Sequence, residues 1–328
     1  MSVTGQVGRL KTVFLFSGQG SHYYQMGRDL FDQRGAFYRS AVELDDLIRQ
    51  HLGISIIETI YDPTRKVSDL FDQTILTHPA IFLIEYALGK ALLDEGVEPD
   101  FVLATSMGAF PALTLAGCIT VEQAIAAVIS QATLVDTHCV AGGILALPNI
   151  SLQQAETFAL SLDCELGSRN NWTACAIAAD KARLDIAEST LRRDGVLFQR
   201  LAVSRAFHSR WIDTAQALYR SFLTSIVVSR PRIPVICCAR AKVLHEIPDA
   251  YLWDVIRQPI RFDDTIRDIC HDGRLRFIDV GPSGTLATSL KYCAPHQGTS
   301  YDIQTVLSPF GGGVARYQQV VSSRTPVG

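Results

Sequence analysis

The sequence lacks the features that mark membrane, secreted and nucleic-acid-binding proteins. It has no run of basic residues, and its 30 lysines and arginines are outnumbered by 33 acidic residues, which gives a net charge of −3. A basic surface for nucleic acid is therefore not expected. No stretch reaches about 18 uninterrupted apolar residues, the length that spans a bilayer. The opening residues MSVTGQVGRLK lack the apolar core of a signal peptide. We expect neither a nucleic-acid partner nor a membrane partner.

The cysteines are scattered, with no C-x-x-C pair and no accompanying histidine cluster. The eight stand at positions 118, 139, 164, 175, 237, 238, 270 and 293. Several lie in apolar contexts, such as Val235-Ile236-Cys237-Cys238. This usage is typical of reduced, buried thiols in a cytoplasmic protein. We therefore expect a cytoplasmic location, no metal site and no disulfide framework.

The composition is that of a globular protein with a sizeable core. Of the 328 residues, 48% are hydrophobic and 19% are charged, which argues against disorder. This length suits one large domain, or one domain that carries a smaller inserted one.

Before residue 140, short apolar strands alternate with helical patterns. Strands are predicted at Lys11–Phe16 and Phe101–Ala104. Apolar residues near helical spacing predict helices over Thr77–Gly96 and Val121–Val135. Strands that alternate with helices in this way favour an α/β fold with a parallel sheet.

From Gly142 the pattern changes to that of a small α+β unit. We predict strands at Ile144–Leu147, Trp172–Ala178 and Val196–Val203, with helices at Leu152–Leu162 and Lys181–Arg193. Strand-helix-strand-helix-strand over about 60 residues is typical of a ferredoxin-like unit.

The main sheet then resumes, so the large domain is predicted to be discontinuous. Ile233–Cys238 and Phe277–Val280 are its later strands. The expected division is a large α/β domain over 11–140 and 204–315, a ferredoxin-like subdomain over 141–203, and a loose C-terminal tail over 316–328.

The most informative stretch is FVLATSMGAFPALTLAGCIT, residues 101–120. Ser106 stands between small residues where a buried strand turns into a helix, the pattern of a nucleophile elbow. Such a turn exposes the serine hydroxyl, and backbone N–H groups at the helix start can receive an oxyanion. Taken alone, the pattern also fits a serine that merely begins a core helix.

Further motifs decide between these two interpretations. They are VFLFSGQGSHYYQMG at 13–27, Thr77-His78-Pro79-Ala80, Ala206-Phe207-His208-Ser209 and Asp279-Val280-Gly281-Pro282. In this order they resemble the malonyl-CoA:acyl-carrier-protein transacylase family, the acyltransferases of fatty-acid and polyketide synthesis. The resemblance runs from about Val13 to about Pro309 and implies a hydrolase-like parallel-sheet domain with an inserted subdomain.

The resemblance assigns roles to particular residues. It implies that Ser106 is the nucleophile and His208 its base, because a serine hydroxyl needs one to attack a thioester. A backbone carbonyl is expected to orient the imidazole, and within Val255-Ile256-Arg257-Gln258-Pro259 we place it at Val255. The backbone N–H groups of Gln19 and Met107 would form the oxyanion hole.

The main departure from the family pattern is at Gln131. Family members that take malonyl groups carry an arginine about 25 residues after the serine, and its guanidinium binds the free carboxylate. This chain has Gln131 there, with no lysine or arginine between Lys90 and Arg169. A glutamine cannot neutralise a buried carboxylate, so malonyl specificity is not expected.

Other departures fall at positions that we assign to substrate binding together with Gln131. Thr105 replaces the family's histidine before the nucleophile. His22 and His78 stand where glutamine is common in relatives.

An intact serine–histidine pair, a GQGSHYYQMG-like loop and glutamine in place of the arginine resemble one branch of the family. This branch is the stand-alone acyl hydrolases of trans-acyltransferase polyketide synthases. It implies a proofreading enzyme that removes stalled acyl groups from acyl carrier protein. The substrate would arrive on the phosphopantetheine arm of that partner, with no cofactor bound by the enzyme itself. We expect a monomer, with Arg169, Arg205 and Arg210 as candidate contacts to the acidic carrier protein.

Three alternatives stay open. The first is a transferase that moves a non-malonyl acyl unit between carrier proteins or from coenzyme A. The second is a non-catalytic subunit that binds carrier protein, although the intact serine–histidine pair argues against it. The third is a general lipase or esterase, which would leave the GQGS loop unexplained.

Overall fold

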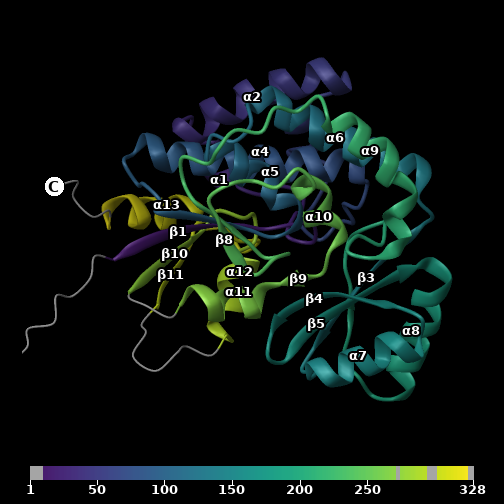
Figure 1. The fold of residues 1–328 in the computed structure, drawn as a ribbon. Helices are drawn as coiled ribbons and strands as arrows, with labels where there is room; N and C mark the ends of the chain where they lie inside the picture. The colour runs from purple at the N-terminus through teal and green to yellow at the C-terminus, as the bar shows by residue number, and fades with distance from the viewer. Residues whose placement is uncertain (1–9, 271–273, 294–300, 324–328) are drawn as a thin grey trace, which may run out of the picture.

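The computed structural model describes residues 10–270, 274–293 and 301–323. Within these ranges the chain forms two β-sheets, each with its own helices (Figure 1). The larger sheet is layered between helices, and the smaller sheet lies to one side with α7 and α8 on its outer face.

The large sheet has the strand order β11-β10-β1-β2-β7-β8. Its strands are β1 (Lys11–Phe16), β2 (Phe101–Ala104), β7 (Val235–Cys237), β8 (Lys242–Leu244), β10 (Leu275–Asp279) and β11 (Tyr301–Thr305). The neighbours from β11 to β7 pair in parallel, and β8 pairs with β7 antiparallel. The predicted α/β class with a parallel main sheet is confirmed.

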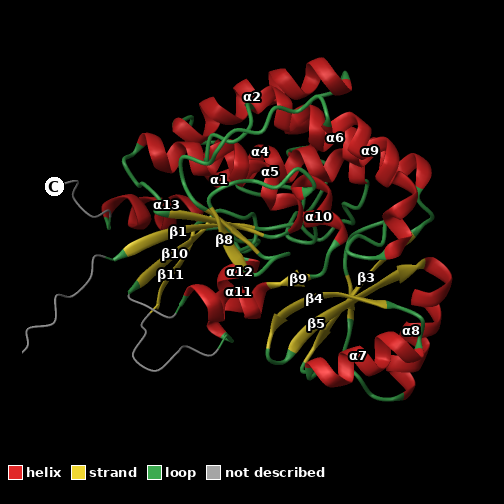
Figure 2. Ribbon diagram, viewed as in Figure 1, coloured by secondary structure: helices red, strands yellow, loops and turns green. Residues whose placement is uncertain are grey.

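Strand β1 is apolar along nearly its whole length because both faces of the sheet are covered. Phe14 and Phe16 belong to the core beneath α4, α5 and α6. Val13 and Leu15 point to the opposite core, which α11 and α12 close. Figure 2 shows these two helical layers, one above and one below the sheet.

Helices connect most of the strands along the chain. They are α1 (Arg28–Phe31), α2 (Ala36–Leu52), α3 (Ile56–Ile60), α4 (Thr74–Asp94), α5 (Ala109–Leu115), α6 (Val121–His138), α7 (Leu152–Ser161), α8 (Lys181–Arg193), α9 (Gln216–Leu223), α10 (Tyr251–Arg257), α11 (Phe262–Ile269), α12 (Thr285–Lys291) and α13 (Gly313–Ser322). Short 3-10 helices cover Ser106–Gly108 and Arg210–Ala215.

Helix α4 is long and apolar enough to cross a membrane by length and composition alone. However, 78% of its most apolar window is buried inside the protein. It packs against α2, α5 and α6, so it serves as a central core helix.

The smaller sheet has the order β6-β3-β5-β4-β9. Its strands are β3 (Gly142–Pro148), β4 (Glu165–Asn171), β5 (Ala174–Asp180), β6 (Gln199–Arg200) and β9 (Ile260–Arg261). With α7 and α8 between them, β3 to β6 form the strand-helix-strand-strand-helix-strand unit of a ferredoxin-like fold. Strand β9 comes from the later part of the chain and pairs with β4 in parallel.

One strand of this unit is missing from the sequence-based prediction. The segment predicted as one strand over Trp172–Ala178 contains the turn that joins β4 to β5. Strand β4 has the sequence ELGSRNN, with only one large apolar residue, and its pairing with β5 is twice interrupted. Without apolar alternation it carries no strand signal.

The C-terminal tail predicted from residue 316 is also wrong as far as residue 322. Residues Gly313–Ser322 form helix α13, and its Val320 is buried. The Tyr317 hydroxyl donates to the carbonyl of Ala91 on α4 at 3.1 Å. Apolar residues spaced three and four apart give this helix a face that packs on the large domain.

Candidate active site

Ser106 lies where β2 turns into α5. Its φ is +52°, in the left-handed region that non-glycine residues seldom adopt. The turn is tight, because a Cβ at Gly108 would lie 2.4 Å from the carbonyl oxygen of Ser17. The side chain is largely enclosed, with the residue 9% exposed. The geometry is that of a strained strand-to-helix elbow.

His208 is hydrogen-bonded to Ser106. Its Nε2 lies 2.8 Å from the Ser106 Oγ, and its Nδ1 lies 2.7 Å from the carbonyl oxygen of Gln258. Because a carbonyl can only accept, Nδ1 carries the proton and Nε2 is free to accept from the serine hydroxyl. This is the tautomer that a general base needs.

The carbonyl that orients His208 belongs to Gln258 and not to Val255, so that prediction is wrong. Val255 lies inside helix α10, which ends at Arg257. Gln258 follows in an extended conformation, with ψ of 151°, which turns its carbonyl out of the helix. Residue 256 of the same stretch also contributes, since the His208 backbone N–H donates to the Ile256 carbonyl at 2.8 Å.

The surroundings keep His208 neutral at pH 7. The pKa of His208 is lowered from 6.5 to about 4, mainly by burial. The nearby charge of Arg257 lowers this pKa further, whereas the hydrogen bond to the Gln258 carbonyl raises it. A neutral imidazole can take a proton at once, which a protonated one cannot.

The loop after β1 lies directly over the elbow. A Cβ at Gly18 would lie 2.7 Å from the Ser106 Cβ, so only glycine permits this approach. Gln19 follows, and its side chain donates to the Thr77 Oγ1 at 3.1 Å. The Met107 N–H lies in the first turn of the helix, where backbone donors have no partner within the helix.

His22 holds this loop in place. Its Nε2 lies 2.7 Å from the Phe71 carbonyl oxygen, and its Nδ1 accepts from the Gly20 N–H at 3.2 Å. Both ring nitrogens are therefore occupied within the chain, and burial lowers the pKa of His22 to about 4. The substrate-binding role predicted for His22 does not fit this arrangement.

His78 and Gln131 are buried beside each other. Burial lowers the pKa of His78 to about 3, and the neighbouring charge of His22 lowers it further, whereas Gln131 raises it. Neither ring nitrogen of His78 and neither amide atom of Gln131 has a hydrogen-bond partner of good geometry among the described residues. The His78 ring lies 5.2 Å from that of Phe207, which precedes His208.

Thr105 is buried at the end of β2. Its backbone N–H donates to the Phe16 carbonyl at 3.0 Å, which ties the elbow to β1.

The arginines predicted to meet a carrier protein are engaged within the chain. Ion pairs link Arg169 to Asp263 at 2.8 Å and to Asp264 at 3.1 Å, Arg205 to Asp136 at 3.4 Å, and Arg210 to Asp163 at 2.6 Å and to Glu165 at 3.0 Å. Arg169 and Arg210 join the inserted unit to the large domain, so their charges are already matched. They fit a structural role better than a docking role.

Two residues beneath the loop belong to no role predicted from the sequence. Ser17 and Glu85 are both buried and hydrogen-bonded to each other. An acid inside the apolar run IFLIEYAL is the signal that could have pointed to Glu85, because a buried carboxyl needs a partner.

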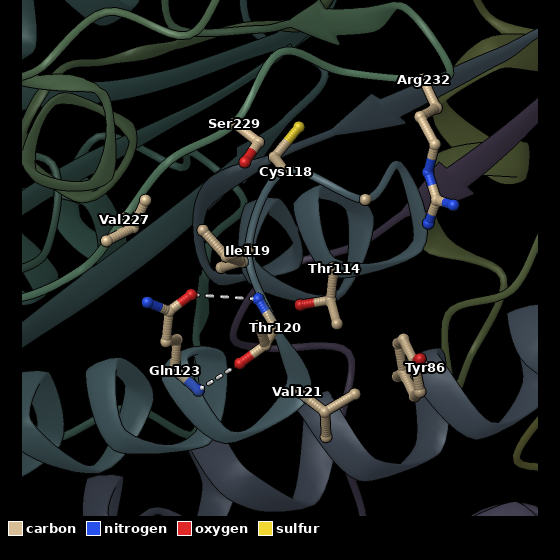
Figure 3. Close-up of a pocket in the computed structure, with 11 residues that line it drawn as sticks. Tyr86, Thr114, Cys118, Ile119, Thr120, Val121, Gln123, Val227, Ser229 and Arg232 are labelled. Carbon is tan, nitrogen blue, oxygen red and sulfur yellow. Dashed lines mark hydrogen bonds between the residues drawn. The ribbon is translucent and has the colours of Figure 1, made fainter.

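A separate pocket of about 410 Å³ opens at the far end of α5 from Ser106 (Figure 3). Tyr86, Cys118, Gln123 and Arg232 are among the residues that line it. None of the candidate site residues belongs to this lining.

All eight cysteines are reduced and buried. Within the described ranges, no group of three or more His, Cys, Asp or Glu side chains is placed to hold a metal ion.

The parts of the site together are able to carry out nucleophilic acyl transfer. A serine hydroxyl, a neutral imidazole oriented by a carbonyl, and backbone N–H groups at a helix start meet at one edge of the parallel sheet. Fold and site define an acyltransferase.

Comparison with known proteins gives the family. The chain matches the acyl transferase domain family over residues 13–306 and belongs to it. The polyketide biosynthesis acyltransferase homolog PksD of Bacillus subtilis (strain 168) is 36% identical, over 96% of this chain and 97% of its own length. The homolog BaeD of Bacillus velezensis is 34% identical, over 95% and 96%. Among solved structures, the malonyl CoA-acyl carrier protein transacylase from Burkholderia pseudomallei has a TM-score of 0.77 at 26% identity, over 88% of this chain and 100% of that one. The predicted family is confirmed.

Proposed function

We propose that the protein is an acyl hydrolase that removes non-malonyl acyl groups from acyl carrier protein in polyketide biosynthesis. Its family membership supports an enzyme that acts on acyl thioesters. The observation that carries the proposal is a buried, uncharged Gln131 in a chain that keeps a complete Ser106–His208 pair.

The first half-reaction forms an acyl-serine. His208 Nε2 takes the proton of Ser106 Oγ as the oxygen attacks the thioester carbonyl. The N–H groups of Gln19 and Met107 stabilise the developing oxyanion. The carbon–sulfur bond then breaks, and His208 returns the proton to the leaving thiolate.

The second half-reaction uses water. His208 takes a proton from a water molecule, and the oxygen attacks the acyl-serine carbonyl. The ester bond breaks, the proton returns to Ser106 Oγ, and a free carboxylic acid leaves. For a carrier-protein substrate, the net result is an empty phosphopantetheine thiol ready for a new acyl unit, which amounts to proofreading.

Gln131 favours neutral acyl groups. Its amide is fully buried and lies against His78, whose lowered pKa leaves the ring uncharged at pH 7. A malonyl carboxylate at this position would be buried without a cation, which is strongly unfavourable. Acetyl or longer acyl chains carry no such penalty.

The partner follows from the same chemistry. The acyl group would reach Ser106 on the phosphopantetheine arm of a carrier protein, with no cofactor resident in the enzyme. A cytoplasmic monomer is part of this proposal. The names of the Bacillus relatives support the polyketide setting.

One experiment tests the proposal: the enzyme is mixed with acetyl- or malonyl-loaded carrier protein, and both proteins are followed by intact-mass spectrometry. Acetyl groups should be lost far faster than malonyl groups. Ser106→Ala should give no acyl-enzyme, and His208→Ala should slow acylation by about 10²–10⁴-fold. Gln131→Arg should gain malonyl loading and lose acetyl turnover, because an unpaired buried guanidinium is costly. Rapid malonyl loading by the unmodified enzyme would contradict the proposal.

The second candidate is a transferase that moves a non-malonyl acyl unit between carrier proteins or from coenzyme A. The naming of the Bacillus relatives as acyltransferase homologs favours it. Adding an unloaded carrier protein to the same assay separates the two. Acyl transfer that outpaces hydrolysis would identify the transferase.

A further inference from the structure

Glu85 is a buried carboxyl that the proposed reaction does not use. It lies in the middle of α4 and is 0% exposed. Burial raises its pKa well above the usual value, while the hydrogen bonds from Ser17 lower it and the nearby Asp279 raises it. No lysine or arginine pairs with Glu85 among the described residues, and its Oε2 has no hydrogen-bond partner. Burial of such a group lowers stability unless hydrogen bonds or an opposite charge compensate for it.

Both hydrogen bonds of the Glu85 carboxyl come from Ser17. The Glu85 Oε1 accepts from the Ser17 backbone N–H at 2.8 Å and from the Ser17 hydroxyl at 2.6 Å. Ser17 Oγ also lies 3.0 Å from the Ser21 Oγ, and Ser21 donates to the Gly18 carbonyl at 2.8 Å. Glu85 therefore holds the residue from which the Gly18-Gln19 loop departs.

A second buried carboxyl, Asp279, orders the segment that packs against Ser17. Asp279 accepts from the Gly281 N–H at 2.9 Å and from the Ala287 N–H at 2.8 Å. Gly281 is packed so closely that a Cβ there would lie 2.4 Å from the Ser17 Oγ. This contact gives the Asp279-Val280-Gly281-Pro282 motif a structural purpose, since it closes the space around Ser17.

The residues on either side of Ser17 contact the segment that holds the reacting serine, Ser106. A Cβ at Gly18 would collide with Ser106, and the carbonyl of Phe16 receives the Thr105 N–H at 3.0 Å. A shift at Ser17 would disturb its chain neighbour Gly18 against Ser106, and with it the next backbone N–H, that of Gln19. A donor aimed at a developing oxyanion tolerates little displacement.

We propose that Glu85 is a positioning residue, which acts through Ser17 to hold the oxyanion-binding loop against the nucleophile. The inference rests on the proposed acyl-serine reaction. Glu85 touches neither substrate nor reacting atoms in this role.

The test replaces Glu85 by leucine, which fills similar space without an acceptor, and by glutamine, which keeps one acceptor oxygen. For hydrolysis of a short acyl thioester, Glu85→Leu should lower kcat by about 10–100-fold with KM within about threefold, because complete removal of one oxyanion donor costs about 10²–10³-fold and a displaced donor keeps part of its effect. Glu85→Gln should keep kcat within about fivefold of the unmodified enzyme. The inhibition constant of a trifluoromethyl ketone, which forms a tetrahedral adduct with a serine, should rise in parallel with the fall in kcat/KM.

The control is Leu92→Ala, a fully buried position on α4 that lies about two helical turns from Glu85. It loosens the same helix without removing a partner of Ser17, so kcat should stay close to the unmodified value in the folded protein. If Glu85→Leu does not fold, Ser17→Ala takes its place and should lower kcat by about tenfold, since it removes one of the two donors.

Two results would overturn the inference. One is a folded Glu85→Leu, or Ser17→Ala in its place, with kcat within twofold of the unmodified enzyme. The other is a loss in Leu92→Ala that equals the loss in the test variant. Turnover that survives Ser106→Ala would instead contradict the proposed function, so the two failures are distinguishable.

Discussion

At the scale of single residues, the environment of His208 sets how activity depends on pH. Its pKa is lowered to about 4, mainly by burial and further by Arg257. The base works only when unprotonated, so kcat/KM should stay constant from pH 7 to about 5 and fall below that, with an acid limb near pH 4. Arg257→Gln should shift this acid limb to higher pH, because Arg257 lowers the pKa of His208. Arg220→Gln, at an exposed position on α9, is the control and should leave it unchanged. An acid limb near 6.5 in the unmodified enzyme would contradict the buried-base geometry.

Single residues could be predicted from the sequence where a motif defines the catalytic role of its residues. They could not be predicted where the role depends on which atoms meet in the folded chain. Ser106 and His208 follow from their motifs, and the structure places them in hydrogen-bond contact. The carbonyl that orients His208 could not be assigned, because its choice among five consecutive residues depends on where α10 ends. His22 was given to the substrate because sequence shows the residue type and not the partners of its two ring nitrogens.

At the scale of elements, the contact between β4 and α11 should contribute stability. Arg169 of β4 pairs with Asp263 and Asp264 of α11, and Asp263 is 1% exposed. Arg169→Gln leaves this buried carboxylate with Arg267 as its remaining ion-pair partner, so we expect a loss of about 2 kcal/mol in the free energy of unfolding. The control is Arg193→Gln, whose side chain is 72% exposed and which should change stability by less than about 0.5 kcal/mol. Urea unfolding measures both. Equal stability of the two variants would contradict the structural role of Arg169.

Some elements with an apolar pattern were predicted to the residue, whereas the polar strand β4 was missed and the strand predicted over Val196–Val203 is only β6 (Gln199–Arg200). Strands β1 and β2 and helix α8 have the predicted bounds. Strand β4 can be polar because backbone pairing with β5 and β9 and the Arg169 ion pairs fix its position. It therefore does not depend on an apolar face. Helix α13 was missed because its apolar face is short and follows three glycines.

At the scale of the whole molecule, buried histidines should make the fold sensitive to acid. The pKa values of His22, His78 and His208 are lowered to about 4, 3 and 4. The unfolded chain therefore binds more protons below pH 6.5, and the stability from these groups is lost as pH falls through this range. Asp279 opposes this, because burial raises its pKa to about 6 and its contribution is lost as pH rises. Glu85 acts in the same direction as Asp279.

The free energy of unfolding should fall by about 1–4 kcal/mol for each pH unit of acidification between pH 6.5 and 5. Each histidine can contribute up to about 1.4 kcal/mol per pH unit to this change. His78→Gln removes one of these histidines, so the change in unfolding free energy per pH unit should be smaller by up to about 1.4 kcal/mol. His51→Gln, at an exposed position on α2, should leave it unchanged. Urea midpoints across this range provide the measurement. A stability that rises on acidification would show that the histidines are not buried as described.

The strand order also has a consequence for how the chain is made. In the main sheet, Lys11 of β1 pairs with Leu275 of β10, whereas β3 to β6 find one another within residues 142–200. During synthesis the inserted unit can complete most of its sheet while β1, which is made before it, still lacks its β10 neighbour on one side. That open edge of apolar residues persists until β10 has been made, so we expect this long-range pairing to form slowly. The strand that leads into the active-site loop is therefore among the last to be secured.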